Sequence, residues 1–360
     1  MMQQSLMFLL GLGALVLGAE LLVRGASRLA LTLGISPLVV GLTVVAFGTS
    51  APEMAVSVDA VLAGNGDLAV GNVVGSNIAN VLLILGLSAL IVPLAVADQL
   101  LRQEIPVMIG ASVLLIVMAL DGTLSVGEGL LLFALVIAYT AFLVVQSRRS
   151  GQAVRDEFAA EMPPAASRWD AHWSVQVLLV AAGLGLLVLG AEWLVDAAVV
   201  MARSFGVSDL VVGLTIVAVG TSMPEIATSL VAAWRGERDI AVGNVVGSNV
   251  FNILACLGAA AAVSDGGIPV STAARNFDLW VMLAVALGCL TIAVPGRTIQ
   301  RWEGAVFLAF YAAYLAYLVL AAQQHAHLPT FSAAMLGYVL PLTVIVLVVN
   351  FVRGNGSPPR

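Results

Sequence analysis

Two glutamates lie in the middle of apolar segments, where a charged side chain needs a chemical reason. Glu53 ends the stretch GTSAPE (residues 48–53), and Glu225 ends the stretch GTSMPE (residues 220–225). A carboxylate inside a membrane span is costly and by default marks an ion or proton pathway. Pairing with a buried arginine is the alternative, but no arginine lies at comparable depth in any apolar segment. The two glutamates are therefore the first candidates for binding a cation.

Hydroxyl side chains and a helix breaker accompany each glutamate. Thr49 and Ser50 precede Glu53, and the second stretch repeats them as Thr221 and Ser222. The proline before each glutamate removes an amide donor and disturbs the carbonyls one turn earlier, which is tolerated where backbone lines a cavity. The candidate carbonyl ligands are those of Ala46, Phe47 and Gly48, with Ala218, Val219 and Gly220 in the second stretch. The alternative is that each proline merely bends its helix and has no further role. That could account for one such motif, but it explains less well why two motifs each carry a glutamate.

A second polar face follows each motif. Asn72, Ser76 and Asn80 recur every four residues, with Asn77 beside them, which places the first three on one side of a helix. The second set contains Asn244, Ser248, Asn249 and Asn252. Contacts between helices are the alternative role, and we expect it for Asn72 and Asn244. The other side chains are candidate ligands.

The collected ligands are hard oxygens, which select Ca²⁺, Mg²⁺, Mn²⁺ or Na⁺ over zinc or copper. Calcium accepts six to eight oxygens in flexible geometry. Two carboxylates carry a formal charge of −2, which one Ca²⁺ or at least two Na⁺ or H⁺ neutralise. Competition of this kind for one site is what an antiporter needs. Cys256 and Cys289 fall inside predicted helices and are interpreted as small buried hydrophobic residues.

The composition predicts a membrane protein. The chain has 360 residues, of which 61% are hydrophobic and 10% charged, and its mean hydropathy is +1.05. A soluble domain carries about 25% charged residues, and an apolar run of about 20 residues spans a bilayer as a helix. We predict eleven spans, the first a retained helix, at residues 6–30, 37–62, 68–93, 103–120, 128–146, 174–200, 209–234, 240–263, 277–294, 303–322 and 333–352.

The arginines orient these spans. All 15 basic residues are arginine, and under this span assignment only Arg203 and Arg275 lie on the side opposite the others. Positive charge concentrates on the cytoplasmic side of membrane proteins. The pattern predicts an N-terminus outside the cell (inner or plasma) membrane and a C-terminus in the cytoplasm.

The chain contains one segment twice. Adding 172 to a position in the first half gives its counterpart in the second, and residues 41–82 match 213–254 at 26 of 42 positions. Because each copy has five spans, an odd number, the second is inverted, an arrangement typical of secondary transporters. We predict a first repeat (1–147), a cytoplasmic linker (148–173), a second inverted repeat (174–323) and an extra C-terminal helix and tail (324–360).

The motifs GTSAPE and GTSMPE, each followed by GNVVGSN, resemble the α-repeats of the calcium/cation antiporter superfamily, especially bacterial sodium/calcium exchanger proteins. The resemblance implies a ten-helix core in which helices two, three, seven and eight bind ions while helices one and six slide. It implies that Glu20 and Glu192, on the sliding helices, are structural or gate residues. Asn252 departs from branches that carry aspartate there. The implied ion ligands are Glu53, Glu225, Thr49, Ser50, Thr221, Ser222, Ser76, Asn80, Ser248, Asn252 and the carbonyls of Ala46 and Ala218.

These observations predict a Na⁺/Ca²⁺ antiporter that works by alternating access. A Ca²⁺(cation)/H⁺ antiporter using the same carboxylates and a passive cation channel remain alternatives, although inverted repeats with broken helices favour a transporter over a channel. No nucleophile and base pair or catalytic metal motif indicates an enzyme. We expect Ca²⁺, Na⁺ and the lipid bilayer as partners, no cofactor beyond the transported ions, no nucleic acid, and infer no protein partner.

Overall fold

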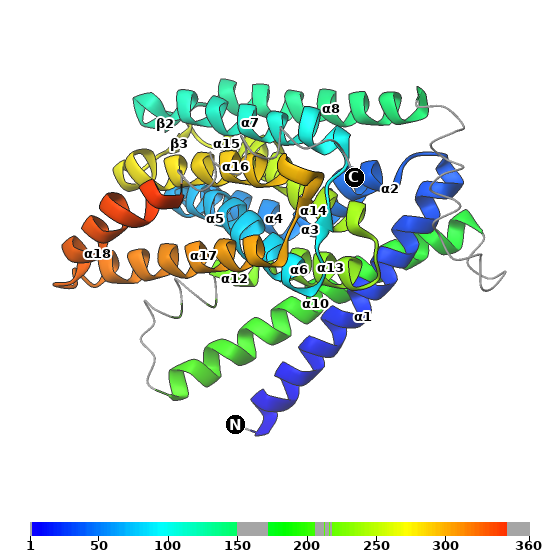
Figure 1. The fold of residues 1–360 in the computed structure, drawn as a ribbon, viewed down its shortest axis with the longest axis horizontal. Coiled ribbons are helices and arrows are strands. Elements are labelled where there is room, and N and C mark those ends of the chain that lie inside the picture. Colours follow the sequence, from blue (N-terminus) through cyan, green and yellow to red (C-terminus); the bar gives the residue numbers. More distant parts are fainter. Residues whose placement is uncertain (1, 150–171, 206–211, 213–215, 217, 344–360) are drawn as a thin grey trace.

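The structure, a computed structural model, describes residues 2–149, 172–205, 212, 216 and 218–343, which form a bundle of helices (Figure 1). Eight helices in this part of the chain are long and apolar enough to cross a membrane, or nine if the bent pair Pro37–Thr49 and Ala51–Leu62 is one span. The predicted all-α polytopic class is confirmed. The spans predicted at 209–234 and 333–352 lie partly outside the described residues.

The first half of the chain contains several long helices broken by short π-helical segments, which are common at functional sites. Its elements are α1 (Met2–Leu33), α2 (Pro37–Val40), the π-helix η1 (Gly41–Val45), α3 (Ala46–Thr49), α4 (Ala51–Leu62), α5 (Gly66–Ala79), the π-helix η2 (Asn80–Leu85), α6 (Gly86–Ile91), β1 (Leu94–Ala95), the π-helix η3 (Leu100–Glu104), α7 (Ile105–Met118), the 3₁₀ turn η4 (Ala119–Asp121), β2 (Thr123–Leu124) and α8 (Val126–Arg149).

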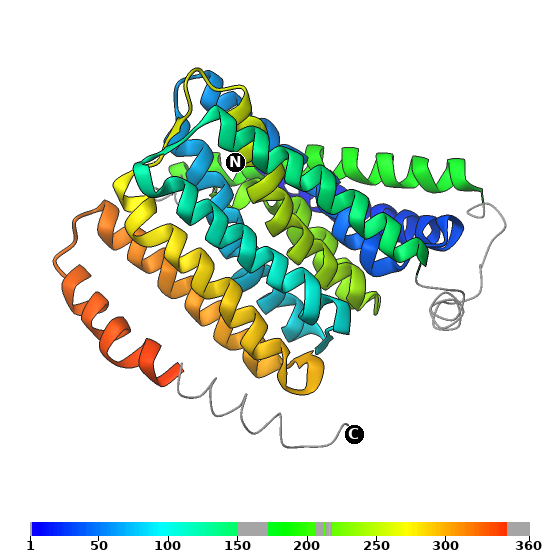
Figure 2. The same cartoon turned by 90° about the horizontal axis from the view of Figure 1, so that it is seen from above.

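The second half repeats this order. Its described elements are α10 (Trp173–Ser204), α12 (Ala218–Gly220), α13 (Met223–Trp234), α14 (Arg238–Phe251), the π-helix η7 (Asn252–Leu257), α15 (Gly258–Ala262), β3 (Ile268–Pro269), the π-helix η8 (Ala274–Asp278), α16 (Leu279–Ala293), the 3₁₀ turn η9 (Pro295–Arg297), β4 (Thr298–Ile299), α17 (Arg301–Ala322), α18 (Leu328–Ala334) and the π-helix η10 (Met335–Val339). Figure 2 shows α18 along the outer side of α17.

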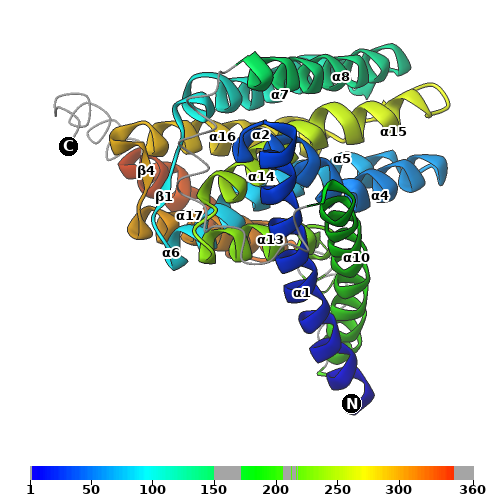
Figure 3. The same ribbon diagram turned by 90° about the vertical axis from the view of Figure 1, so that its right-hand side faces the viewer.

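Helices α1 and α10 pack side by side and project from the rest of the bundle (Figure 3). Glycines bring the two backbones together. A Cβ atom at Gly18 would lie 2.8 Å from the Gly183 carbonyl oxygen, and one at Gly183 would lie 2.7 Å from that of Gly18. Gly11 and Gly190 meet in the same reciprocal way. At the 172-residue offset Gly11 corresponds to Gly183 and Gly18 to Gly190. The contact between Gly18 and Gly183 therefore recurs as the contact between Gly190 and Gly11, which is the mark of a two-fold relation between the two halves of the chain.

Two short antiparallel strand pairs mark the ends of the bundle. β1 pairs with β4, and β2 pairs with β3. Helix α5 begins against β3, because a Cβ atom at Gly66 would touch Ile268 and Pro269. Helix α15 ends just before the same strand. The segments α5–α6 and α14–α15 therefore run in opposite directions, as inverted repeats require, while their orientation across a membrane stays a prediction.

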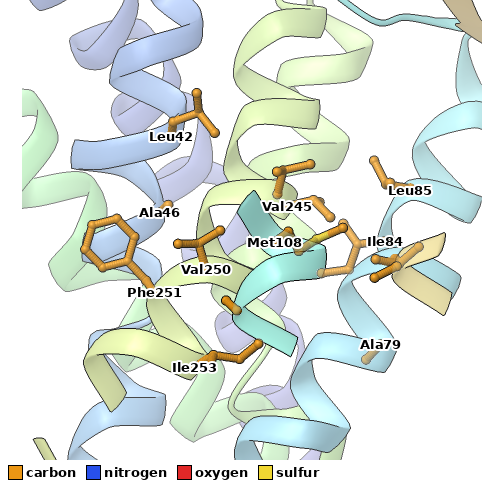
Figure 4. Packing of buried hydrophobic residues seen from close by; sticks show 14 of the residues in the cluster. Leu42, Ala46, Ala79, Ile84, Leu85, Met108, Val245, Val250, Phe251 and Ile253 are labelled. Atoms are coloured by element: carbon orange, nitrogen blue, oxygen red, sulfur yellow. The ribbon is translucent and has the colours of Figure 1, made fainter. Parts of the chain in front are cut away.

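The core lies between the central helices of the two halves. Figure 4 shows Leu42 and Ala46 beside Val245 and Val250 of α14, and all four side chains are buried. A Cβ atom at Gly247 would lie 2.7 Å from the Leu42 carbonyl oxygen, so glycine allows α14 to approach this segment closely. Among the eight spans, Gly66–Ile91 and Arg238–Ala262, which carry the candidate ligands Ser76, Asn80, Ser248 and Asn252, are the most buried.

Candidate ion-binding site

Each GTS(A/M)PE motif folds as a break between two helices. Helix α3 ends at Thr49, Ser50 sits at the break with φ −84° and ψ 3°, and α4 begins at Ala51. The two helices differ in direction by 42°. Ser222 repeats this conformation with φ −84° and ψ 6° before α13. Because proline lacks an amide hydrogen, Pro52 deprives the carbonyl one turn earlier of its helical partner, which explains a break at this position.

The two breaks face each other and exchange hydrogen bonds. The Ser50 hydroxyl donates to Oε1 of Glu225 at 3.1 Å, and the Ser222 hydroxyl donates to Oε1 of Glu53 at 3.2 Å. Both carboxylates are completely buried. Each half therefore orients the carboxylate of the other, and the predicted juxtaposition of the two motifs is what the structure shows.

A ring of threonine, asparagine and serine side chains supports this pair. The Thr49 hydroxyl donates to Oδ1 of Asn244 at 3.2 Å, and Asn244 donates to the Ser229 hydroxyl at 2.9 Å. In the equivalent place, Thr221 donates to Oδ1 of Asn72 at 3.3 Å. Asn72 also donates to the Ser57 hydroxyl and the Glu53 carbonyl oxygen. Asn72 and Asn244 thus join helices, the role expected for them.

Four asparagines close the opposite side of the site. Asn80 donates to Oδ1 of Asn249 at 2.9 Å, and Asn252 donates to Oδ1 of Asn77 at 3.1 Å. The π-helical segments η2 and η7 begin at Asn80 and Asn252 respectively. The wider turn at these positions occurs at equivalent places in both halves. Asn77 and Asn249 therefore fix the two amides that the sequence marks as candidate ligands.

Several buried oxygens in this site have no hydrogen-bond partner among the described residues. They are Oε2 of Glu53, Oε2 of Glu225, Oδ1 of Asn80 and the hydroxyl of Ser248. Buried polar atoms are almost always paired, so each exception needs an explanation. All four belong to the predicted ligand set, and all can donate a lone pair to a cation. Their residues fit a hard cation, and Glu53 and Glu225 supply its countercharge.

The other predicted ligands differ in their surroundings. The Ser76 hydroxyl oxygen lies 3.1 Å from that of Ser222, within hydrogen-bond distance. The Ala46 carbonyl accepts the Ser50 amide at 3.0 Å, and the Thr49 hydroxyl, which donates to Asn244, lies 3.4 Å from the same carbonyl oxygen. Ala218 begins α12. Their roles as ligands stay predictions.

Neutral oxygens dominate the site. In the part of the chain that the structure describes, no group of three or more histidine, cysteine, aspartate or glutamate side chains could hold a metal ion. The ion pairs in the same part of the chain involve neither Glu53 nor Glu225. Among the described residues, neither carboxylate therefore has a cationic side chain as its electrostatic partner.

Sequence reasoning did not identify Met108 and Met282 as neighbours of the site. Asn249 approaches the Met108 sulfur at 3.2 Å, and Asn77 approaches the Met282 sulfur at 3.6 Å. Both methionines lie in apolar helices, α7 and α16, whose sequences carry no polar signal. Only the folded arrangement brings them to the asparagines.

Glu20 and Glu192 lie outside the hydrogen-bonded site, as expected for residues that are not ligands. Glu20 on α1 forms an ion pair with Arg235 at the end of α13, whereas Glu192 is exposed on α10. Arg102 and Arg297, predicted on one side of the membrane, both pair with Asp98. Their shared partner agrees with that grouping.

A multi-pass helical bundle with a buried pair of carboxylates and unpaired oxygens defines a membrane transporter of cations. The family described as "Sodium/calcium exchanger protein" matches residues 4–145 and 175–320. The chain belongs to this family. The matched segments fall within the two predicted repeats.

Individual relatives are similar over nearly their whole length. The chain is 39% identical to the "Putative antiporter CaxA" of Alkalimonas amylolytica, with 87% of this chain and 98% of the relative covered. It is 35% identical to the "Sodium/calcium exchanger MaX1" of Methanosarcina acetivorans, with 87% and 97% covered. A solved structure of the sodium-calcium exchanger NCX_Mj, soaked with Na⁺ and Ca²⁺, superposes with a TM-score of 0.74 at 32% identity and covers 87% of this chain and 98% of its own.

Proposed function

We propose that this protein exchanges Ca²⁺ for Na⁺ across a membrane by alternating access. The observation that carries the proposal is the facing pair Glu53 and Glu225, each buried with one oxygen unpaired and the other held by the opposite half. Membership of the exchanger family supports cation exchange, and a relative named as a sodium/calcium exchanger supports these two ions.

The chemistry follows from charge and ligand type. One Ca²⁺ between Glu53 and Glu225 cancels their two negative charges and takes further oxygens from the neighbouring amides and hydroxyls. Two Na⁺ ions cancel the same charge at overlapping and flanking oxygens. Because either cargo satisfies the site, each displaces the other. The ligand set that we propose is Glu53, Glu225, Thr49, Ser50, Thr221, Ser222, Ser76, Asn80, Ser248, Asn252 and the carbonyls of Ala46 and Ala218.

Alternating access requires one part of the fold to move against another. Helices α1 and α10 form a separate pair that projects from the ligand-bearing helices (Figure 3). We propose that this pair slides across the two helix breaks and exposes the site to one side at a time. The fixed central site and the inverted halves suit such a motion.

The arginine distribution supports a location in the cell membrane with the N-terminus outside and the C-terminus in the cytoplasm. The proposed organisation keeps two repeats at 1–147 and 174–323, joined by a cytoplasmic linker at 148–173 and followed by a C-terminal segment at 324–360.

Transport of radioactive Ca²⁺ into proteoliposomes tests the function. An outward Na⁺ gradient should drive Ca²⁺ uptake, whereas equal Na⁺ on both sides should not. Vesicles with pH and K⁺ gradients serve as comparisons. Intact, folded protein that shows no Na⁺-dependent uptake would refute Na⁺/Ca²⁺ exchange.

Substitution of the carboxylates tests the site. Glu53→Gln and Glu225→Gln should each abolish Ca²⁺ transport, because one remaining carboxylate leaves a bound Ca²⁺ uncompensated. Glu104→Gln is the matched control, since Glu104 is equally buried but is held by Tyr139, Gln99 and Gln103. Wild-type flux in either site variant contradicts the proposal.

Exchange of Ca²⁺ for H⁺ is the second candidate. Each buried carboxylate has an unpaired oxygen, to which a proton could bind in place of a metal ion, since burial favours the neutral form. Uptake that follows a pH gradient and ignores Na⁺ supports this candidate. Coupled uphill counterflow of either kind excludes a passive channel.

A further inference from the structure

A single sulfur atom lies at the edge of the proposed ion site. Sγ of Cys256 is 3.6 Å from Oδ1 of Asn252 and 3.7 Å from the carbonyl oxygen of Ser50. The side chain is buried, and the two residues that its sulfur approaches, Ser50 and Asn252, both belong to the proposed ligand set. Cys256 is therefore part of the environment that a bound cation meets, and not only a small hydrophobic residue.

This sulfur breaks the correspondence between the two halves. The equivalent position, 172 residues earlier, is Ile84, which is fully buried in η2. Glu53, Ser50 and Asn80, by contrast, have identical counterparts in the second half. An apolar side chain thus satisfies the packing at this position in one half, whereas the other half places a soft donor beside the ligands.

Unpaired oxygens of the site that Cys256 borders provide the other observation that points to a metal ligand. Oε2 of Glu53, Oε2 of Glu225 and Oδ1 of Asn80 are buried without a hydrogen-bond partner. Together with Sγ of Cys256 they form a mixed set of hard and soft donors. Thiolate sulfur prefers soft metal ions, whereas Ca²⁺ and Na⁺ prefer oxygen.

We propose that Cys256 is a ligand for soft divalent cations, with Cd²⁺ as the probe, that enter the same site as Ca²⁺. On binding, the S–H bond breaks, an S–Cd bond forms and the proton passes to water, with no change of oxidation state. The sulfur holds Cd²⁺ more tightly than oxygen alone does, so the ion blocks exchange. This inference rests on the proposed function for the identity of the site.

Binding to the purified full chain tests the ligand without any transport. Cd²⁺ should produce an ultraviolet sulfur-to-metal charge-transfer band in the wild type and in Cys289→Ser. Cys289 is the matched control because it is equally buried, in α16, and among the described residues it forms no hydrogen bond with the site. The band should be absent in Cys256→Ser and should weaken as Ca²⁺ is added. A band that survives in Cys256→Ser, or one that excess Ca²⁺ leaves unchanged, overturns the proposal.

Inhibition of Ca²⁺ flux provides the second measurement. Inhibition by Cd²⁺ is compared with each variant's own Ca²⁺ flux in the absence of Cd²⁺. Cys256→Ser retains the size of the side chain, and Cd²⁺ should inhibit its flux roughly 10-fold less strongly than that of the wild type, the lower end of losses seen when support for a metal site is removed. Cys256→Ala should behave alike. Equal inhibition of the wild type and both variants overturns the role of the sulfur. Absence of Ca²⁺ flux in the wild type rejects the proposed function instead, and the binding experiment still decides whether Cys256 holds Cd²⁺.

Discussion

The ion pair between Glu20 and Arg235 offers a direct test of the proposed motion, because it joins α1 to the end of a ligand-bearing helix. The pair links the two halves, and the equivalent positions at the 172-residue offset form no such pair. Glu192, the counterpart of Glu20, is exposed, and the counterpart of Arg235 is Ala63. We predict that this pair stabilises the present position of α1 relative to α13. Glu20→Gln and Arg235→Gln should each shift the protein toward the opposite state.

The size of the effect follows from the exposure of the pair. The two side chains are 33% and 34% exposed, so solvent screens their attraction. Pairs of this kind contribute about 0.2–1 kcal/mol. At most this changes the ratio of the two states by about fivefold, since about 1.4 kcal/mol corresponds to tenfold. Apparent affinities on the two membrane faces should then change in opposite directions by a few-fold, because each depends on the fraction of the competent state.

Ca²⁺ uptake in inside-out and right-side-out vesicles measures both apparent affinities. The comparison includes wild type, each single variant, the double variant and Glu192→Gln, which removes the same charge from an unpaired position. A double-mutant cycle isolates the coupling between Glu20 and Arg235. Strictly additive effects, or an equal shift in Glu192→Gln, would refute the idea that the pair holds α1.

Three further predictions follow from local contacts. Gly18→Ala should reduce the free energy of unfolding by about 1–3 kcal/mol, because the added Cβ meets backbone atoms of α10. The melting temperature in detergent should fall accordingly. A Cβ atom at Gly13 meets no described atom within 4 Å, so Gly13→Ala should leave the melting temperature unchanged. Equal melting temperatures of the two variants would contradict the prediction. Asn77→Ala should cost about 1–3 kcal/mol by leaving the Asn252 amide unpaired, and an unchanged melting temperature argues against it. Burial raises the pKa of Glu237 above its ordinary value. The carboxyl group is protonated in both folded and unfolded states at low pH, so Glu237→Gln and wild type should melt alike there. Above the raised pKa the wild type must bury a charged carboxylate, so the Glu237→Gln variant should have the higher melting temperature. A difference in melting temperature that stays constant across pH contradicts this prediction.

The fold and the paired motifs could be predicted because their signals are local and repeated. Apolar length identifies spans such as α8 and α17, and the 172-residue offset identifies which polar residues belong together. Proline and glutamate at fixed spacing identify the helix breaks at Ser50 and Ser222. These features depend on the chemistry of short segments, which the sequence displays directly.

The hydrogen bonds that cross from one half of the chain to the other could not be predicted in the same way. Nothing in the spacing of Ser50 indicates that its hydroxyl reaches Glu225 rather than Glu53, which lies three residues away. The contacts of Met108 and Cys256 depend on how separate helices pack. The resemblance to exchangers supplied the candidate ligands but carried no information on residues peculiar to this chain.

The crossed serine bonds explain why a duplicated segment can form one site. If Ser50 held Glu53 and Ser222 held Glu225, each half would be complete alone and could separate from the other without cost to its carboxylate. Instead, the orientation of each carboxylate depends on the opposite half. Separation of the halves would therefore remove a hydrogen bond from both carboxylates at once, which favours keeping the central helices together during the motion that we propose for α1 and α10. The halves can then differ at their edges, at Cys256 and Arg235, without loss of the common centre.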